Sequence, residues 1–152
     1  MAELVTDRFT VGVFQDLAWA ERGVDALVRH GFVPASMSLI AKASPAVEAF
    51  AQRAFGGTPR RLDVKQLGDC VVQGLLVAAL EDEGGHLSKV GLAASARLAG
   101  FQSHDGLIFE RLVARGGILV GVTSEARAAD ALATLHAYGG GNAAIGTWTG
   151  RV

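Results

Sequence analysis

Two short stretches of the chain hold side chains whose types and spacing could support chemistry. The first is Glu81-Asp82-Glu83-Gly84-Gly85-His86, which places carboxylates and an imidazole within six residues at a Gly-Gly turn. Carboxylate oxygens and a histidine nitrogen bind divalent cations, so Glu81, Glu83 and His86 are the candidate metal ligands. No second His or Cys follows at a ligand spacing, and an acidic run between apolar segments is typical of a solvated loop. We therefore expect no resident metal.

The second stretch is His104-Asp105, with Glu110 further along the same segment. A carboxylate that orients an imidazole can create a general base, so His104 and Asp105 are the candidate catalytic residues. Ser103 and Asp105 are also typical of a helix start, where acidic groups favour the helix dipole. The helix start is the interpretation we prefer, and it leaves the catalytic residues unknown.

Two further features indicate structure rather than chemistry. Cys70 lies among Val71, Val72 and Leu75 with no basic neighbour in sequence, which predicts a buried and inert thiol. The run Gly139-Gly140-Gly141 follows a predicted helix and precedes a strand, whereas a phosphate loop lies between a strand and a helix start. It predicts a turn, and we expect no cofactor.

Charge and composition exclude several classes of function. Fourteen Lys and Arg against fifteen Asp and Glu give a formal charge of -1, so no overall field attracts nucleic acid or an anionic membrane. The longest strongly apolar stretch, Gly74 to Leu80, is far shorter than the roughly 20 residues of a spanning helix, so we expect no integral membrane association. A single cysteine and no apolar leader at the start favour a cytoplasmic location.

The chain is rich in apolar residues for its size. Half of its 152 residues are hydrophobic and only 19% are charged, which is much apolar surface for one small domain to bury. This composition favours a homo-oligomer, although a high alanine content alone raises such averages. Trp19, early in a predicted helix, and Trp148, on a predicted edge strand, are the candidate interface residues.

The pattern of elements predicts one α+β domain over residues 1–152. A strand, helix and strand follow each other in 8–42 and again in 116–150. Val11-Gly12-Val13 matches Val120-Gly121-Val122, and after a shift of one residue Asp16, Ala20, Val24, Leu27 and Gly31 match Ser124, Ala128, Leu132, Leu135 and Gly139. Two such units predict a ferredoxin-like split βαβ fold with a four-stranded antiparallel sheet, two central strands side by side and two helices on one face. Residues 43–115 would form a long, mainly helical insertion. Within it, Ser44 caps a helix that ends at Gly56-Gly57, 58–67 is a polar connection, Cys70-Val71-Val72 is either helix or strand, and 87–98 and 105–114 are helical.

Half of the chain resembles a family of small bacterial general stress proteins. The resemblance rests on TVGVF, AERGVDALVRHGF and SMSLIAK in residues 9–42, and on HDGLIFERLVARGGILVGV in residues 104–140. Many members of that family carry a longer glycine-rich apolar hairpin in the middle, a region that Glu81-Asp82-Glu83 interrupts here. The resemblance implies the fold and a stress-related or accessory role, without established catalytic residues.

These features lead to one functional hypothesis and one rival. The first is a non-enzymatic, homo-oligomeric accessory or stress-associated protein that acts through protein contacts at a sheet edge and at exposed aromatic residues. The alternative is a small-molecule enzyme or sensor of the dimeric ferredoxin-like type. Its site would lie between sheet and insertion, with His104, Asp105 or His86 as the polar group.

Overall fold

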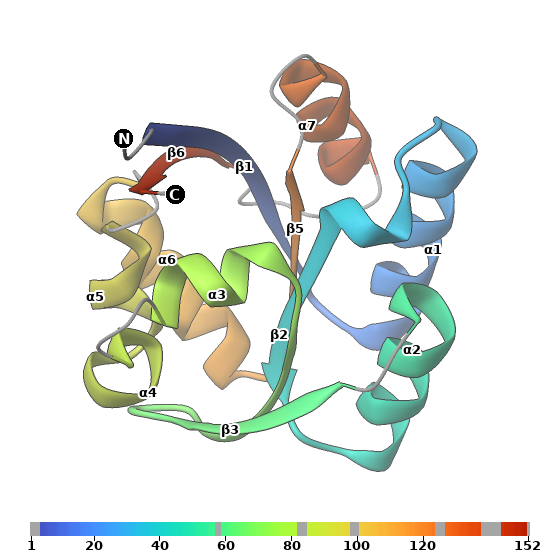
Figure 1. The fold of residues 1–152 in the computed structure, drawn as a ribbon. Helices are drawn as coiled ribbons and strands as arrows, with labels where there is room; N and C mark the ends of the chain where they lie inside the picture. The colour runs from blue at the N-terminus through green and yellow to red at the C-terminus, as the bar shows by residue number, and fades with distance from the viewer. Residues whose placement is uncertain are drawn as a thin grey trace.

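A computed structural model of the chain describes residues 4–56, 59–81, 85–97, 101–123, 127–137 and 144–151. Its centre is an antiparallel sheet of six strands in the order β3-β4-β2-β5-β1-β6 (Figure 1). The strands are β1 (Leu4–Phe14), β2 (Met37–Lys42), β3 (Arg60–Val64), β4 (Gly68–Gln73), β5 (Ile118–Thr123) and β6 (Ala144–Arg151). The helices are α1 (Leu17–Arg29), α2 (Pro45–Phe55), α3 (Leu75–Glu81), α4 (His86–Val90), α5 (Leu92–Ala96), α6 (Ser103–Ala114) and α7 (Ala128–Ala137). The predicted α+β class is confirmed.

The first strand-helix-strand unit forms as its local signals predict. The carboxylate of Asp16 accepts a hydrogen bond of 2.9 Å from the backbone N–H of Trp19, which caps the start of α1. Gly31, at a φ of +92°, ends the helix, and the N–H of Phe32 then bonds back to the carbonyl of Leu27. Ser44 caps α2 in the same way as Asp16 caps α1, through the N–H of Val47.

Strands β1 and β5 lie side by side, as predicted, but the centre of the six-stranded sheet is formed by β2 and β5, because the β3–β4 hairpin extends one side. Helices α1 and α7 lie on the same face of the sheet (Figure 1). Leu27 of α1 and Leu135 of α7, which match in the repeat, are both buried in one apolar cluster. The similar triplets around Gly12 and Gly121 are not equivalent, because Gly12 faces Leu135 while Gly121 faces Leu76 on the opposite side of the sheet. The two units are therefore equivalent in their helices, but the matching glycines of their strands face opposite sides of the sheet.

The sheet has six strands rather than the predicted four. A hairpin of β3 and β4, with Gln66 at a φ of 76° in its turn, extends the sheet beyond β2. The prediction of a polar connection over 58–67 is wrong for Arg60–Val64, which form β3, because an edge strand can keep charged residues exposed. The strand alternative for Cys70-Val71-Val72 is confirmed, and helix begins only at Leu75.

Helices cover both faces of the sheet, rather than the one face predicted (Figure 1). Helix α2 joins α1 and α7 over one face, and the later insertion helices α3 to α6 cover the other. The predicted helix over 87–98 is two short helices, because Gly91 between them has a φ of +92°. The insertion is thus helical in most of its length, but it also contributes two strands.

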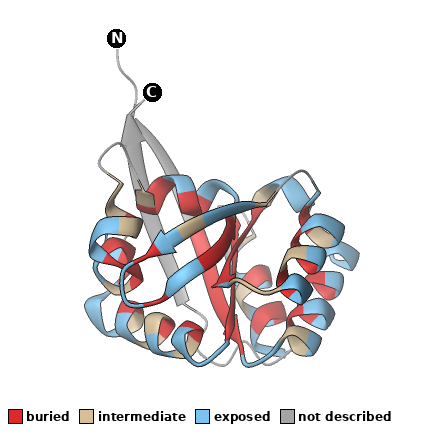
Figure 2. Ribbon diagram, turned by 90° about the horizontal axis from the view of Figure 1, so that it is seen from below, coloured by how far each residue is buried: buried red, intermediate tan, exposed pale blue. Residues whose placement is uncertain are grey.

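Two apolar clusters, one on each face, hold these layers together. Alternate residues of β1 enter opposite clusters, so that Val11 and Val13 face the insertion while Phe14 faces α1. Figure 2 shows the buried residues along the sheet and on the inner sides of the helices, with exposed residues outside. Because both faces of the sheet are covered, the sheet edges and the outer helix surfaces remain for contacts with other molecules.

Candidate functional site

Of the predicted metal ligands, Glu81 at the end of α3 has a structural partner among the described residues. The Oε1 atom of Glu81 accepts a hydrogen bond of 2.8 Å from the N–H of Ser88, in the first turn of α4. His86 is half-buried, and its Nδ1 atom has no hydrogen-bond partner among the described residues. Glu83 lies outside the described residues. Within the described part, no three His, Cys, Asp or Glu side chains come together to hold a metal.

The predicted catalytic residues lie at the start of α6. His104 is exposed, and Asp105 is half-buried in the first turn of the helix. Glu110, which would have completed the set, accepts a hydrogen bond of 3.1 Å at its Oε2 atom from the N–H of Ala93. Its carboxylate therefore stabilises the start of α5 and connects that helix to α6.

Cys70 is buried on β4, in the cluster that faces the insertion. Burial, together with the nearby negative charge of Asp69, raises the pKa of its thiol to about 11. The thiol is thus protonated near neutral pH and has little nucleophilic character. The predicted burial of Cys70 is confirmed.

The space between the sheet and the insertion is almost filled by apolar side chains. A remaining cavity of about 10 Å³ has room for about one water molecule. It is lined by Val11, Leu76, Leu80, Leu92, Ala96, Phe101, Phe109 and Leu119. Neither His86 nor His104 reaches this cavity, which offers a small-molecule ligand no polar group from the residues that line it.

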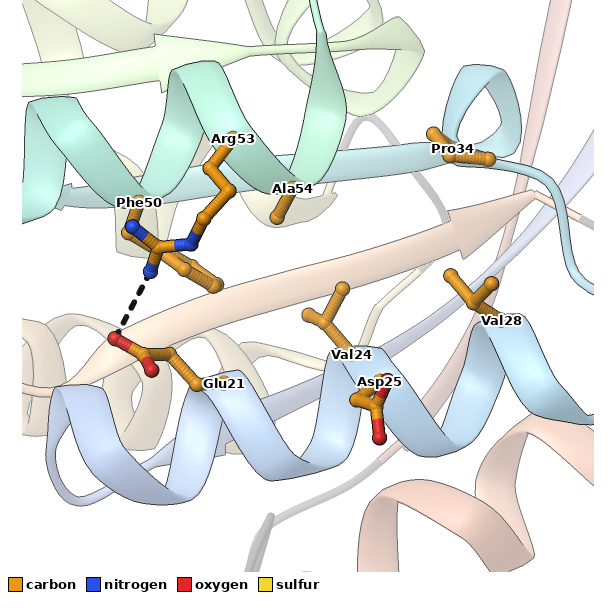
Figure 3. A pocket seen from close by; sticks show the side chains of 8 residues that line it. All are labelled: Glu21, Val24, Asp25, Val28, Pro34, Phe50, Arg53 and Ala54. Carbon is orange, nitrogen blue, oxygen red and sulfur yellow. Dashed lines mark ion pairs between the residues drawn. The ribbon is translucent and has the colours of Figure 1, made fainter.

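One hollow on the described surface is a groove between α1 and α2 (Figure 3). Its volume is about 450 Å³, within the range of roughly 300–1,000 Å³ that ligand-binding clefts occupy. Val24 of α1 faces Phe50 and Ala54 of α2 across it, and Val28 lies opposite Pro34 at one end (Figure 3). We call this feature the α1–α2 groove.

Charged side chains form the rims of the α1–α2 groove. Glu21 and Asp25 stand on the α1 side, one helical turn apart, and Arg53 stands on the α2 side. The guanidinium of Arg53 lies 3.1 Å from a carboxylate oxygen of Glu21, so the two rims are connected at one point (Figure 3). The groove therefore combines an apolar floor with rims of opposite charge.

A second hollow, of about 440 Å³, lies between the end of α1 and α7. His30, Arg127, Asp130 and Thr134 are its polar lining residues. Arg127 is held over the ring of Phe32 at 4.2 Å from the centroid, and its Nε atom is 3.4 Å from Asp130. These contacts give Arg127 a structural role between α1 and α7.

The two predicted interface residues lie on different elements. Trp19 is half-buried on α1, beside the apolar cluster, with the guanidinium of Arg22 at 5.0 Å from its ring centroid. Trp148 lies on β6, opposite Asp7 of β1, and its side chain is outside the described residues. The predicted edge position of its strand is confirmed, since β6 is the last strand of the sheet. Whether either residue forms an interface remains a prediction.

Sequence reasoning did not identify the α1–α2 groove. A signal was present, because Val24 and Val28, and likewise Phe50 and Ala54, are four residues apart and so lie on one face of their helices. That spacing fits core packing equally well, and only the arrangement of the two helices shows that part of the stripe stays accessible.

No family model matches the chain, and no curated protein or solved structure matches it. In the part of the chain that the structure describes, no helix is both long and apolar enough to cross a membrane.

Proposed function

We propose that this chain is a non-enzymatic, homo-oligomeric accessory protein that acts through protein contacts. The observation that carries the proposal is the unprotected edge of the sheet at β6. In the sheet of described strands, β6 pairs with β1 on one side and with no strand on the other. A free strand edge presents backbone N–H and C=O groups that can pair with a strand of another chain.

The two edges of the sheet differ in how they discourage such pairing. Three of the five residues of β3 are charged, namely Arg60, Arg61 and Asp63, and Arg61 also forms ion pairs with Glu48 and Asp69. Strand β6 is longer, with eight residues, and its only charged residue is Arg151 at the end. Charged residues protect edge strands from association, so β6 is the edge that favours a second copy of the chain.

Several side chains that could have supported chemistry have structural roles instead. The carboxylates of Glu81 and Glu110 accept hydrogen bonds from helix starts, and the thiol of Cys70 is buried and protonated near neutral pH. Glu81, Glu110 and Cys70 thus have structural explanations that require no substrate.

The finer fold assignment and the biological setting belong to the same proposal. We read β6-β1-β5-β2 with α1 and α7 as a ferredoxin-like unit, to which the β3–β4 hairpin and α2 to α6 are additions. The stress-related role rests on the resemblance of residues 9–42 and 104–140 to bacterial general stress proteins. A cytoplasmic location is part of this proposal.

The subunit count is tested by native mass spectrometry and light scattering on the full chain. We expect a discrete oligomer for the wild type and a monomer for Thr149→Lys, because a lysine on β6 adds a charge to the unprotected edge. Asp63→Lys places a lysine on the other edge strand and should leave the oligomer intact. A monomeric wild type, or an oligomer that Thr149→Lys leaves unchanged, would contradict pairing through β6.

A further inference from the structure

We infer that the α1–α2 groove binds an amphipathic helix of a protein partner. This inference builds on the proposed contact-making function and names a second surface, separate from the β6 edge. The groove lies between two helices, and each helix contributes a pair of apolar residues spaced by one turn: Val24 with Val28, and Phe50 with Ala54 (Figure 3). A third helix fits such a trough when its own apolar residues recur at the same helical spacing.

The floor and the entrance of the groove differ in accessibility. Val24 and Phe50 are 3% and 1% exposed, so they form a packed floor. Val28, at the side of the groove, is 45% exposed, although a valine gains free energy when it is removed from water. An incoming apolar side chain would cover Val28 without rearranging the floor.

The charges on the rims define the chemistry of the partner. Glu21 and Asp25 lie along α1, and each forms an exposed ion pair within the chain, Glu21 with Arg53 at 3.1 Å and Asp25 with Arg29 at 3.2 Å. Exposed ion pairs contribute little stability, so a helix that lies in the groove can exchange them for its own, with basic residues toward α1 and an acidic residue toward Arg53. Complementary charges of this kind fix the orientation of a bound helix more than they add affinity.

The groove and the β6 edge lie over different parts of the sheet. Helix α2 packs over β2 and β4, whereas α7 packs over β1 and β6, with α1 between them (Figure 1). Pairing of β6 with a second copy would leave the α1–α2 groove accessible. One assembly could then hold one partner helix on each chain.

The test uses a fluorescein-labelled peptide of about 18 residues, long enough to form a helix in water. It carries leucines at i, i+3, i+4 and i+7, lysines along one flank and glutamates along the other, and its control has serine in place of each leucine. Anisotropy measures its affinity for the full chain. We expect saturable binding of the leucine peptide and none of the serine peptide.

Two valines provide a matched pair of variants. Val28→Asp puts a carboxylate into the groove and should weaken peptide binding by about tenfold or more, because the charge would be buried without a partner. Val33→Asp makes the same change at a position that is 58% exposed and does not line the groove, and it should bind as the wild type does. The double variant Glu21→Lys with Asp25→Lys should weaken binding by about three- to tenfold.

The outcomes separate this inference from the proposed function. Loss of peptide binding in Val28→Asp, with the oligomer intact, would support the inference. Absence of saturable binding, or equal binding by Val28→Asp and Val33→Asp, would overturn it while leaving an oligomer through β6 unaffected. If Val28→Asp instead dissociates the oligomer, the groove belongs to a second copy of the chain and the helix-binding inference is wrong.

Discussion

At the scale of single residues, polar groups that could do chemistry act mainly as structural caps. Asp16 and Ser44 cap α1 and α2, as their positions before apolar helical stripes predict. Glu81 and Glu110 serve helix starts in the insertion that lie 7 and 17 residues away from them in the chain. Local sequence patterns identify the first kind of cap, but the second kind depends on how separate helices are arranged and could not be predicted.

Cys70 offers a test of this residue-scale picture through the pH dependence of stability. Its thiol pKa is raised from 9.0 to about 11 in the folded chain, because burial disfavours the thiolate. The contribution of this pKa shift to the free energy of unfolding is fully present below 9.0, the pKa of the thiol in the unfolded chain. It is lost as the pH rises toward about 11. We expect the free energy of unfolding to fall more steeply between these limits in the wild type than in Cys70→Val.

Urea denaturation at a series of pH values measures this difference, with Cys70→Val as the reference for every other group that titrates. Thiol labelling at neutral pH provides the companion measurement, and it should be slow in the folded chain and fast in urea. Parallel pH profiles for the two proteins, together with rapid labelling of the folded chain, would show that Cys70 is accessible.

At the scale of elements, the sequence predicts the helices and strands whose apolar residues follow one regular helical or strand spacing. The strands around Val11 and Val120 and the helices α1, α2 and α6 lie close to their predicted positions. Strand β3 was missed because only Leu62 and Val64 of its residues face the core, a pattern that resembles a polar connection. Glycines decide other boundaries, as Gly91 does between α4 and α5, and their positive φ is not visible in an apolar pattern.

The packing of α1 on the sheet depends on Gly23. A Cβ atom at this position would clash with the ring of Phe14, which is itself fully buried. We expect Gly23→Ala to lower the free energy of unfolding by about 1–3 kcal/mol through this overpacking, even though alanine favours helices.

Thermal and urea unfolding of Gly23→Ala measure this loss. Ala18→Gly, at an exposed position of the same helix, reports helix propensity alone and should cost about 1 kcal/mol. A Gly23→Ala variant that is more stable than the wild type would mean that α1 lies further from Phe14 than described here.

At the scale of the whole molecule, the two proposed contact surfaces have different physical characters. The β6 edge offers backbone hydrogen bonds along a strand of low charge, whereas the α1–α2 groove offers apolar contact between charged rims. The apolar composition of the sequence predicts that another molecule covers part of the surface, but it does not locate that part. Among the described residues, the location follows from the coverage of both sheet faces by helices, which leaves the weakly charged β6 edge and the α1–α2 groove accessible.

Because the two surfaces are separated by α7, we expect their functions to be independent. Thr149→Lys should abolish the oligomer and change the peptide dissociation constant by no more than about twofold, as changes at distant sites are nearly additive. Val28→Asp should have the opposite effect, because it should weaken peptide binding and leave the oligomer intact. Light scattering and anisotropy on both variants measure this double dissociation, with calorimetry giving one peptide per chain. A peptide that binds only the oligomer would instead place its site across two chains.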